Sequence, residues 1–215
     1  MTLQKSREVV GCSVWVMNDL IFFPLALVMA LAIIASAALP GKDRLACGSV
    51  SGAGTNYQTI LVEGNDLCRM NASGQSELQR QEADGKITAI SIAAGAGLLG
   101  DRPDRNPHFR LAADLETQFA GHQIKVTIVA RPSDERGASV FQANYSAGQE
   151  GNSGWKTFRM MPDYKEYSFL WDVPLRGAGE TAVDYLAIRP VVPSKVRSID
   201  VKSVRFDRIR KTPAS

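Results

Sequence analysis

The side chains that could perform catalysis are few and far apart in this chain of 215 residues. Its two histidines, His108 and His122, do not neighbour an acidic or cysteine cluster. Serine and cysteine hydrolases need a base beside the nucleophile, and these imidazoles are the only candidates for that base. The sequence contains no HExxH, CxxC, GxSxG or phosphate-binding glycine motif. We therefore expect a protein that is not an enzyme and that carries no cofactor.

The loop over residues 100–107 carries oxygen atoms of the kind that bind a metal ion. The side chains of Asp101, Asp104 and Asn106 could coordinate calcium there. Two arginines alternate with these residues, and pairing of aspartate with arginine in a proline-bounded loop explains this composition better than a metal does. We therefore predict no metal site, with these three residues as the weak candidates for one.

Four aromatic residues are candidates for stacking against the ring of a sugar. They are Trp155, Tyr164, Trp171 and Tyr185. Trp155 follows the sequence Gly-Asn-Ser-Gly and Tyr164 lies in a predicted turn, so both could be exposed. Trp171 and Tyr185 fall on predicted strands, where a place in the hydrophobic core is the competing interpretation.

An apolar run without charged residues lies near the N-terminus. It extends from Leu20 to Gly41, and ~20 residues of helix are enough to cross the ~30 Å hydrocarbon layer of a bilayer. We predict a transmembrane helix over residues 19–41, preceded by a short and cytoplasmic segment over residues 1–18. A cleaved signal peptide is the alternative, but the apolar part of a signal peptide is usually only ~7–15 residues long.

The same predicted helix has a stripe of small residues. Ala26 and Ala30 are four positions apart, and Ala37 falls on the same helical face. Small residues allow close contact between membrane helices, so the stripe predicts packing against other integral membrane subunits. The lipid bilayer is the other predicted partner of the helix.

Positive charges flank the predicted helix on both sides, so they do not decide its orientation. Long domains that follow such a helix are usually exported. Cys47 and Cys68 could form a disulfide in an oxidising compartment, and two separate buried thiols are the alternative. We expect the protein in a bacterial inner membrane, with its large domain in the periplasm.

The region after the predicted helix is rich in signals for short strands. A Gly- and Ser-rich stretch within residues 42–56 predicts a flexible linker, followed by a domain over residues 57–211 and a tail over residues 212–215. Apolar and polar residues alternate in eight short segments. The segments are Thr59–Glu63, Lys86–Ala93, Phe109–Thr117, Gln123–Ala130, Ser139–Tyr145, Glu166–Asp172, Asp184–Arg189 and Ser198–Arg208. This pattern predicts an all-β fold, a two-sheet β-sandwich of jelly-roll type.

Two local features refine this prediction. In the last segment the apolar residues change parity between Val201 and Val204. Such a change needs an extra residue, so a β-bulge is predicted near Lys202 and Ser203. The polar stretch 74–83 is predicted to be a loop or a single helical turn, and no long helix is expected after residue 45.

A family resemblance lies in the order of features toward the C-terminus. A strand that ends at Arg131 is followed by a segment that begins with Trp155. Three further strand patterns follow, at Tyr167–Trp171, Asp184–Pro190 and Val196–Phe206. This order resembles the galactose-binding-like jelly rolls, a superfamily that includes many carbohydrate-binding modules. The resemblance implies a jelly-roll β-sandwich, and it speaks for a fold more than for a ligand.

The charge distribution argues against nucleic-acid binding, because the net charge is only +3 and charges of both signs are interspersed. We expect a non-enzymatic accessory or scaffold subunit that stabilises a larger membrane complex, such as a bacterial photosynthetic or respiratory complex. The alternative is a membrane-tethered carbohydrate-binding module that captures a glycan of the cell envelope or outside the cell. An exposed groove with Trp155 and Tyr164 beside amides and acids would favour this alternative.

Overall fold

A computed structural model describes residues 19–38, 47–72, 76–97, 99–177 and 183–211 of the protein. The chain divides into two units, Met1–Leu45 and Ala46–Ser215. The predicted N-terminal segment over residues 1–18 and the predicted tail over residues 212–215 lie outside the described residues.

The described part of the first unit is one helix, α1 (Asp19–Ala38), and residues 39–41 of the predicted span lie outside the described residues. Ala26, Ala30 and Ala37 belong to this helix, although the side chain of Ala37 lies outside the described part of the structure. Within the described residues, no helix combines the length and the apolar character that crossing a bilayer requires. The prediction of a membrane-spanning helix is therefore not supported.

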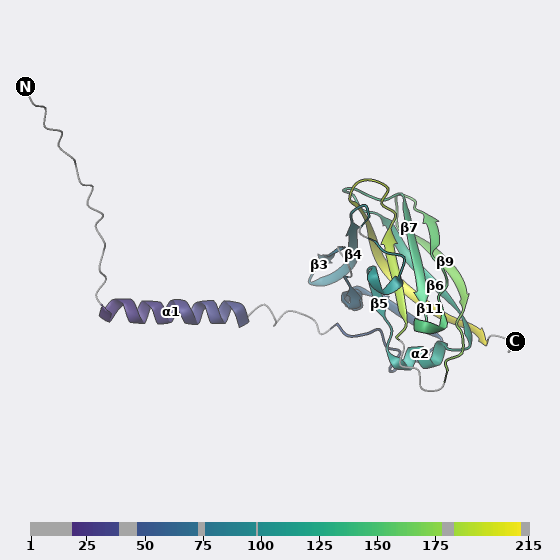
Figure 1. Ribbon diagram of the computed structural model, residues 1–215, viewed down its shortest axis with the longest axis horizontal. Helices are drawn as coiled ribbons and strands as arrows, with labels where there is room; N and C mark the ends of the chain where they lie inside the picture. The colour runs from purple at the N-terminus through teal and green to yellow at the C-terminus, as the bar shows by residue number, and fades with distance from the viewer. Residues whose placement is uncertain (1–18, 39–46, 73–75, 98, 178–182, 212–215) are drawn as a thin grey trace, which may run out of the picture. The chain divides into compact units, whose positions relative to one another are not determined.

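The second unit is a sandwich of two antiparallel sheets, which confirms the predicted two-sheet β-sandwich (Figure 1). The larger sheet has the strand order β3-β4-β11-β6-β9, and β1 also pairs with β11. Its strands are β1 (Thr59–Glu63), β3 (Glu77–Ala83), β4 (Lys86–Ala94), β6 (His122–Pro132), β9 (Lys165–Asp172) and β11 (Arg197–Lys211). The smaller sheet has the order β2-β5-β10-β7-β8. Its strands are β2 (Met70–Asn71), β5 (His108–Arg110), β7 (Val140–Ser146), β8 (Lys156–Arg159) and β10 (Tyr185–Pro190).

The core lies between the two sheets and is filled by alternate residues of each strand. On β6 these residues are Ile124, Val126 and Ile128, and on β10 they are Leu186 and Ile188, all fully buried. Successive side chains of a strand point to opposite faces, so the residues between them form the outer faces of the sandwich. Each such buried aliphatic side chain stabilises the fold by about 1.5–3 kcal/mol.

The predicted β-bulge in the last strand is confirmed. The pairing of β11 with β6 shifts register between Val201 and Ser203. Because of this extra residue, Val201 and Val204 both face the core, although they have opposite parity.

Two segments differ from the prediction. The expected strand over residues 109–117 ends at Arg110, and a short helix, α2 (Ala113–Phe119), follows it. Leu115 and Phe119 are four positions apart, so a helix buries both on one face. The predicted loop over residues 74–83 contains β3, which pairs with β4 at the edge of the larger sheet. Its residues are mostly exposed, so it lacks the apolar alternation of the inner strands.

The stretch predicted as a linker contributes to the domain from residue 47 onward. Val50 is only 2% exposed, and its backbone bonds to Arg110 and Ala112. Cys47 and Cys68 form a disulfide with a Cα–Cα distance of 5.6 Å, which ties this stretch to η2 (Gly64–Arg69). The start of the sandwich is therefore held by both covalent and backbone contacts.

Candidate functional site

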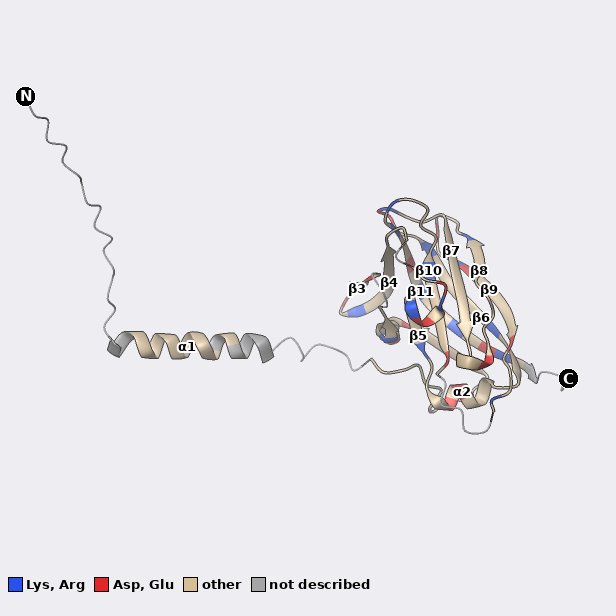
Figure 2. Cartoon of the chain, in the orientation of Figure 1, with Lys and Arg blue, Asp and Glu red and all other residues tan. Residues whose placement is uncertain are grey.

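The outer face of the smaller sheet is polar and carries the candidate site. Tyr185 on β10 lies opposite Ser146 on β7, and Arg189 lies opposite Gln142 on the same pair of strands. These residues alternate with the core residues of β10 and β7, so their side chains point away from the core. Figure 2 shows that acidic and basic residues are mixed along the strands in that view.

A hollow of about 420 Å³ lies at one end of this face, where three segments of the chain converge. The first segment contains η3 (Pro103–Arg105), the second contains the end of β7 and η4 (Gly148–Glu150), and the third is the start of β10. The lining residues are Arg102, Pro103, Asp104, Ser146, Gly148, Gln149, Asn152, Val183 and Tyr185. The hollow falls within the size range of pockets that hold small ligands.

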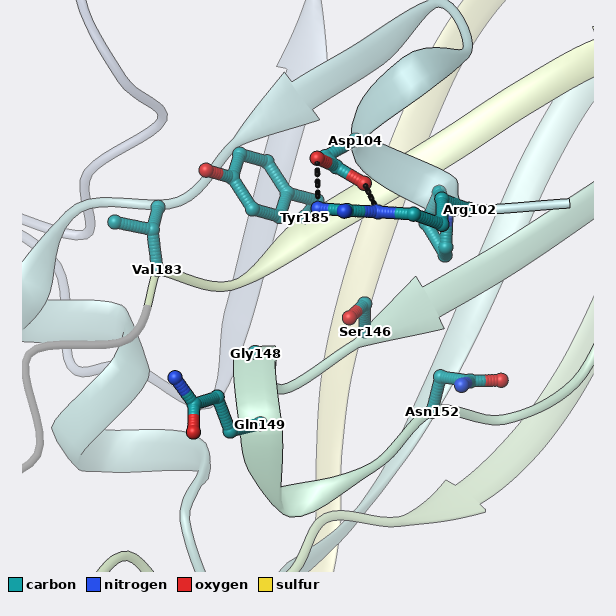
Figure 3. A pocket seen from close by; sticks show the side chains of 9 residues that line it. Arg102, Asp104, Ser146, Gly148, Gln149, Asn152, Val183 and Tyr185 are labelled. Atoms are coloured by element: carbon teal, nitrogen blue, oxygen red, sulfur yellow. Dashed lines mark hydrogen bonds and ion pairs between the residues drawn. The ribbon is translucent and has the colours of Figure 1, made fainter. Parts of the chain in front are cut away.

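One wall of the hollow combines an aromatic ring with an ion pair (Figure 3). The ring of Tyr185 is fixed by an edge contact with His108, with a distance of 4.9 Å between ring centroids. The guanidinium of Arg102 donates two hydrogen bonds to Asp104, at 2.7 and 3.1 Å. Because each charge is balanced by its partner, this wall presents polar groups without a net charge.

The opposite wall carries uncharged hydrogen-bonding groups. Figure 3 shows Ser146, Gly148, Gln149 and Asn152 across the hollow from Tyr185. The carbonyl oxygen of the Asn152 side chain accepts bonds from Asn144 and from the Gly154 backbone. Its amide nitrogen bonds to no other described residue, and it remains a donor for a ligand. Gly148 has a φ of +63°, a conformation that favours glycine at the start of this turn.

A buried charge network is centred on Asp184, which lies in the sequence between two lining residues of the hollow, Val183 and Tyr185. The carboxylate of Asp184 accepts a hydrogen bond from the Tyr145 hydroxyl at 2.8 Å and pairs with Arg176 at 2.5 Å. Arg176 also pairs with Glu116 on α2, at 3.0 Å. Burial raises the pKa of Asp184 to about 6, although the bonds from Tyr145 and Arg176 oppose this shift. Because these bonds hold Asp184, the network fixes the path of the chain at the start of β10.

Of the four aromatic candidates, Tyr185 alone lines this hollow. Trp155 lies further along the same face, with the Arg189 guanidinium 3.8 Å from the centre of its ring. Trp171 packs against the core, 5.0 Å from Tyr145 between ring centroids. Tyr164 lies beside Arg131, a residue of the larger sheet, with the guanidinium 5.0 Å from its ring centre. The four residues therefore do not form one site.

Two of the three weak metal candidates have other partners for their side chains. Asp104 is paired with Arg102. The amide nitrogen of Asn106 donates to the backbone oxygens of Gly100 and Arg102, and the backbone oxygen of Asp101 accepts the indole N–H of Trp155. In the part of the chain that the structure describes, no group of three or more His, Cys, Asp or Glu side chains could hold a metal ion.

Most residues of the hollow were not identified from the sequence. The loop of Arg102 is more than forty positions away from the loop that contains Gln149 and Asn152, and neither loop has a recognisable motif. Only the spatial convergence of these loops reveals the site, and no local pattern marks it.

No family model matches the chain, and no curated protein matches it. Solved structures do match. The CBM22-1 xylan-binding domain of Paenibacillus barcinonensis Xyn10C is 5% identical with a TM-score of 0.47, over 73% of this chain and 96% of that one. A xylan-binding module named CBM15 is 18% identical with a TM-score of 0.43, over 72% of this chain and 98% of that one.

A third match is the CBM22-1 and GH10 part of Clostridium thermocellum endo-1,4-beta-D-xylanase 10B, complexed with xylohexaose. It is 13% identical with a TM-score of 0.45, over 72% of this chain and 30% of that one. Identities and TM-scores this low carry no inference about the ligand of this chain. Its function has to be inferred from its own residues.

Proposed function

We propose that the sandwich is a non-catalytic module that binds carbohydrate in the hollow beside Tyr185. The observation that supports this proposal is the convergence of one aromatic ring with several hydrogen-bonding groups around a hollow of about 420 Å³. A sugar has C–H groups on its ring faces and hydroxyl groups around its rim. Its ring face packs on an aromatic side chain, while amides, hydroxyls and charged groups bind the rim.

The charge of the hollow favours an uncharged sugar. The one cation and the one anion among the lining residues, Arg102 and Asp104, are paired with each other. Bringing a second charge next to this pair would compete with the existing bonds, whereas a hydroxyl group can bond to the pair without breaking it. Gln149 and Asn152 offer amide groups that both donate and accept hydrogen bonds.

This proposal corresponds to the alternative function inferred from the sequence, a carbohydrate-binding module, and replaces the expected accessory subunit. Trp155 and Tyr164 contact different arginines, Arg189 and Arg131, and neither lines the hollow, so the proposal assigns the stacking role to Tyr185. A membrane anchor and neighbouring membrane subunits have no support in α1. The periplasmic location of the domain stays a prediction, and the disulfide is compatible with an oxidising compartment.

The proposal is tested on a glycan array with the full chain. We expect neutral oligosaccharides to be retained, and we expect Tyr185→Ala to weaken that retention about fivefold, because the loss of an aromatic contact costs on the order of 1 kcal/mol. Tyr185→Phe keeps the ring and should bind nearly as the unaltered chain does. Tyr164→Ala, at a half-buried tyrosine outside the hollow, is the matched control. Retention of no glycan, or unchanged retention by Tyr185→Ala, would contradict the proposal.

A further inference from the structure

The outer face of the larger sheet carries a second hollow that the proposed function does not use. It is a groove of about 320 Å³ at the end of β3, β4 and β11, bounded by the loop that follows β6. The larger and smaller sheets face each other through the core, so this groove and the hollow beside Tyr185 lie on opposite outer faces of the sandwich.

The floor of the groove is made of small side chains. Ala93 on β4 lies opposite Ser198 on β11, and Ser91 lies opposite Asp200 on the same pair of strands. Small residues at neighbouring positions leave the surface of the sheet low between taller walls. The floor therefore gives an extended ligand room to approach the strands.

One wall is a row of long polar side chains on the edge strand β3. Glu77, Gln79 and Gln81 occupy alternate positions and all line the groove. Alternate residues of a strand point to the same side and are about 6.8 Å apart, so this row offers polar groups at a regular interval. A regular interval suits a ligand made of repeated units that lies along the strand.

The opposite wall is the loop over residues 133–136, and it is firmly held on the sheet. The hydroxyl of Ser133 donates to Asp200 at 2.6 Å, and the Ser198 backbone N–H donates to the Arg136 oxygen at 3.0 Å. Arg131 donates two bonds to Asp134, at 2.8 and 3.0 Å. A wall that is already in place costs little ordering entropy when a ligand binds.

Several polar groups of the groove have no internal partner. The side chains of Glu77, Gln79 and Glu135 make no hydrogen bond or ion pair with another described residue, in contrast to Gln81, which donates to Ser91. Asp200 at the floor is by contrast engaged internally and only 1% exposed: its Oδ1 atom accepts bonds from Ser91 and Ser133, and its Oδ2 atom lies 3.1 Å from Arg131. The two walls therefore offer free carboxylate and amide oxygens that face a common space.

The chemistry of the groove identifies its class of ligand. Carboxylates and amides bind hydroxyl groups well, since each carboxylate can accept more than one O–H. The lining contains no aromatic residue, so a ligand would be held by hydrogen bonds and not by stacking. The acids Glu77, Asp134, Glu135 and Asp200 outnumber Arg136 and the adjacent Arg131, so the groove repels anions.

We infer that this groove is a second binding site of the domain, for an uncharged oligosaccharide that lies along β3 and is held by hydrogen bonds alone. The inference goes beyond the proposed function, because it concerns a different sheet and a different mode of recognition. One domain would then hold two glycan chains on opposite faces.

Ligand-observed NMR on the full chain tests the inference. The probes are xylohexaose, cellohexaose and mannohexaose as neutral ligands, with oligogalacturonate as the anionic one. We expect the Tyr185→Ala chain to retain binding to a neutral hexasaccharide and to show none to oligogalacturonate. Adding Glu77→Ala and Gln79→Ala should weaken the remaining binding at least tenfold. Arg80→Ala, on the same exposed strand but outside the groove, is the matched control and should change nothing.

Each outcome assigns the binding to a site. If Tyr185→Ala abolishes all binding, or if the pair at Glu77 and Gln79 has no effect on what remains, the inference is wrong and the first hollow stands alone. If Glu77→Ala and Gln79→Ala together remove all binding in a chain with intact Tyr185, the groove binds the sugar and the hollow does not. If no probe binds the unaltered chain, both the proposed function and this inference are wrong. Circular dichroism melting of each variant excludes loss of fold as the cause.

Discussion

The guanidinium of Arg189 covers one face of the Trp155 ring, with its central carbon 3.8 Å from the ring centre. The same guanidinium donates to the backbone oxygen of Gly100 at 2.6 Å, and the Trp155 indole donates to that of Asp101 at 3.0 Å. The stacked pair therefore holds the loop that carries Arg102. One wall of the proposed sugar site depends on a contact that lies outside the hollow.

Replacement of Arg189 by alanine should loosen this loop. The substitution removes the stacking contact and the bonds to Gly100 and Gln142, and we expect a loss of about 2–3 kcal/mol in the free energy of unfolding. Urea unfolding measures this loss, and acrylamide quenching should show a more accessible tryptophan. Arg159→Ala, at an exposed position on β8, is the control. Quenching that stays at the level of the unaltered chain would contradict the prediction that Arg189 holds this loop in place.

The stability of the domain should depend on pH through Asp184. Burial raises its pKa to about 6 in the folded state, above the value of about 3.9 in an unfolded chain. The folded state thus binds the proton more tightly, so the contribution of this group is full below the unfolded pKa and is lost as the pH rises through 6. The free energy of unfolding should gain about 1 kcal/mol from Asp184 when the pH falls from 7.5 to 5.

Comparison with Asp184→Asn isolates this effect, because the amide does not titrate in that range. Urea unfolding of both chains at pH 7.5 and pH 5 gives the difference between them at each pH. The unaltered chain should gain stability relative to the variant at pH 5. A gain at pH 7.5 instead would mean that the ion pair with Arg176 outweighs the burial of the carboxylate.

The disulfide between Cys47 and Cys68 should contribute to stability through the unfolded state. It closes a loop with a sequence separation of 21, for which the chain-entropy model gives about 3 kcal/mol. The chain with both cysteines replaced by serine should unfold at a correspondingly lower urea concentration. A reductant should shift the unaltered chain in the same way and leave the variant unchanged. If the reductant affects both equally, the disulfide is not the source of the shift.

Gly52 should not tolerate a side chain. A Cβ atom at this position would lie 2.6 Å from two ring carbons of Tyr57 and 2.8 Å from Leu115. We expect Gly52→Ala to lower the free energy of unfolding by about 1–3 kcal/mol, because the Leu115 side chain is fully buried and cannot move aside freely. Gly48→Ala, whose added Cβ atom would lie 4.0 Å from the flexible guanidinium of Arg69, is the matched control. Equal melting temperatures for the two variants would contradict the predicted crowding.

The sequence predicts the inner strands of the sandwich well and its periphery poorly. The parity change around Val201 and Val204 carries enough information to place the β-bulge, because every apolar residue there must reach the core. β3 has no such constraint, since its residues are mostly exposed, and a polar sequence of this kind is equally typical of a loop. In α2, the run around Leu115 is too short for a helical period to stand out from alternation.

The candidate site was predictable only in part. Tyr185 belongs to a recognisable strand, and its aromatic ring marks it as a possible sugar contact. The partners around it, such as Arg102 and Asn152, lie in loops whose positions are set by strand pairing and not by nearby residues. Trp155 looked equally promising in the sequence, but its contact with Arg189 comes from a strand more than thirty positions away.

β11 has a consequence for how this protein is made. β4 and β1 pair with successive parts of this strand, while β6 pairs along nearly all of it. A ribosome releases β1 first and β11 last, so the larger sheet cannot close until synthesis has passed residue 211. Until then, β1, β4 and β6 have unpaired edges that can join the wrong strand. The growing chain should therefore depend on chaperones during translation far more than the finished domain does.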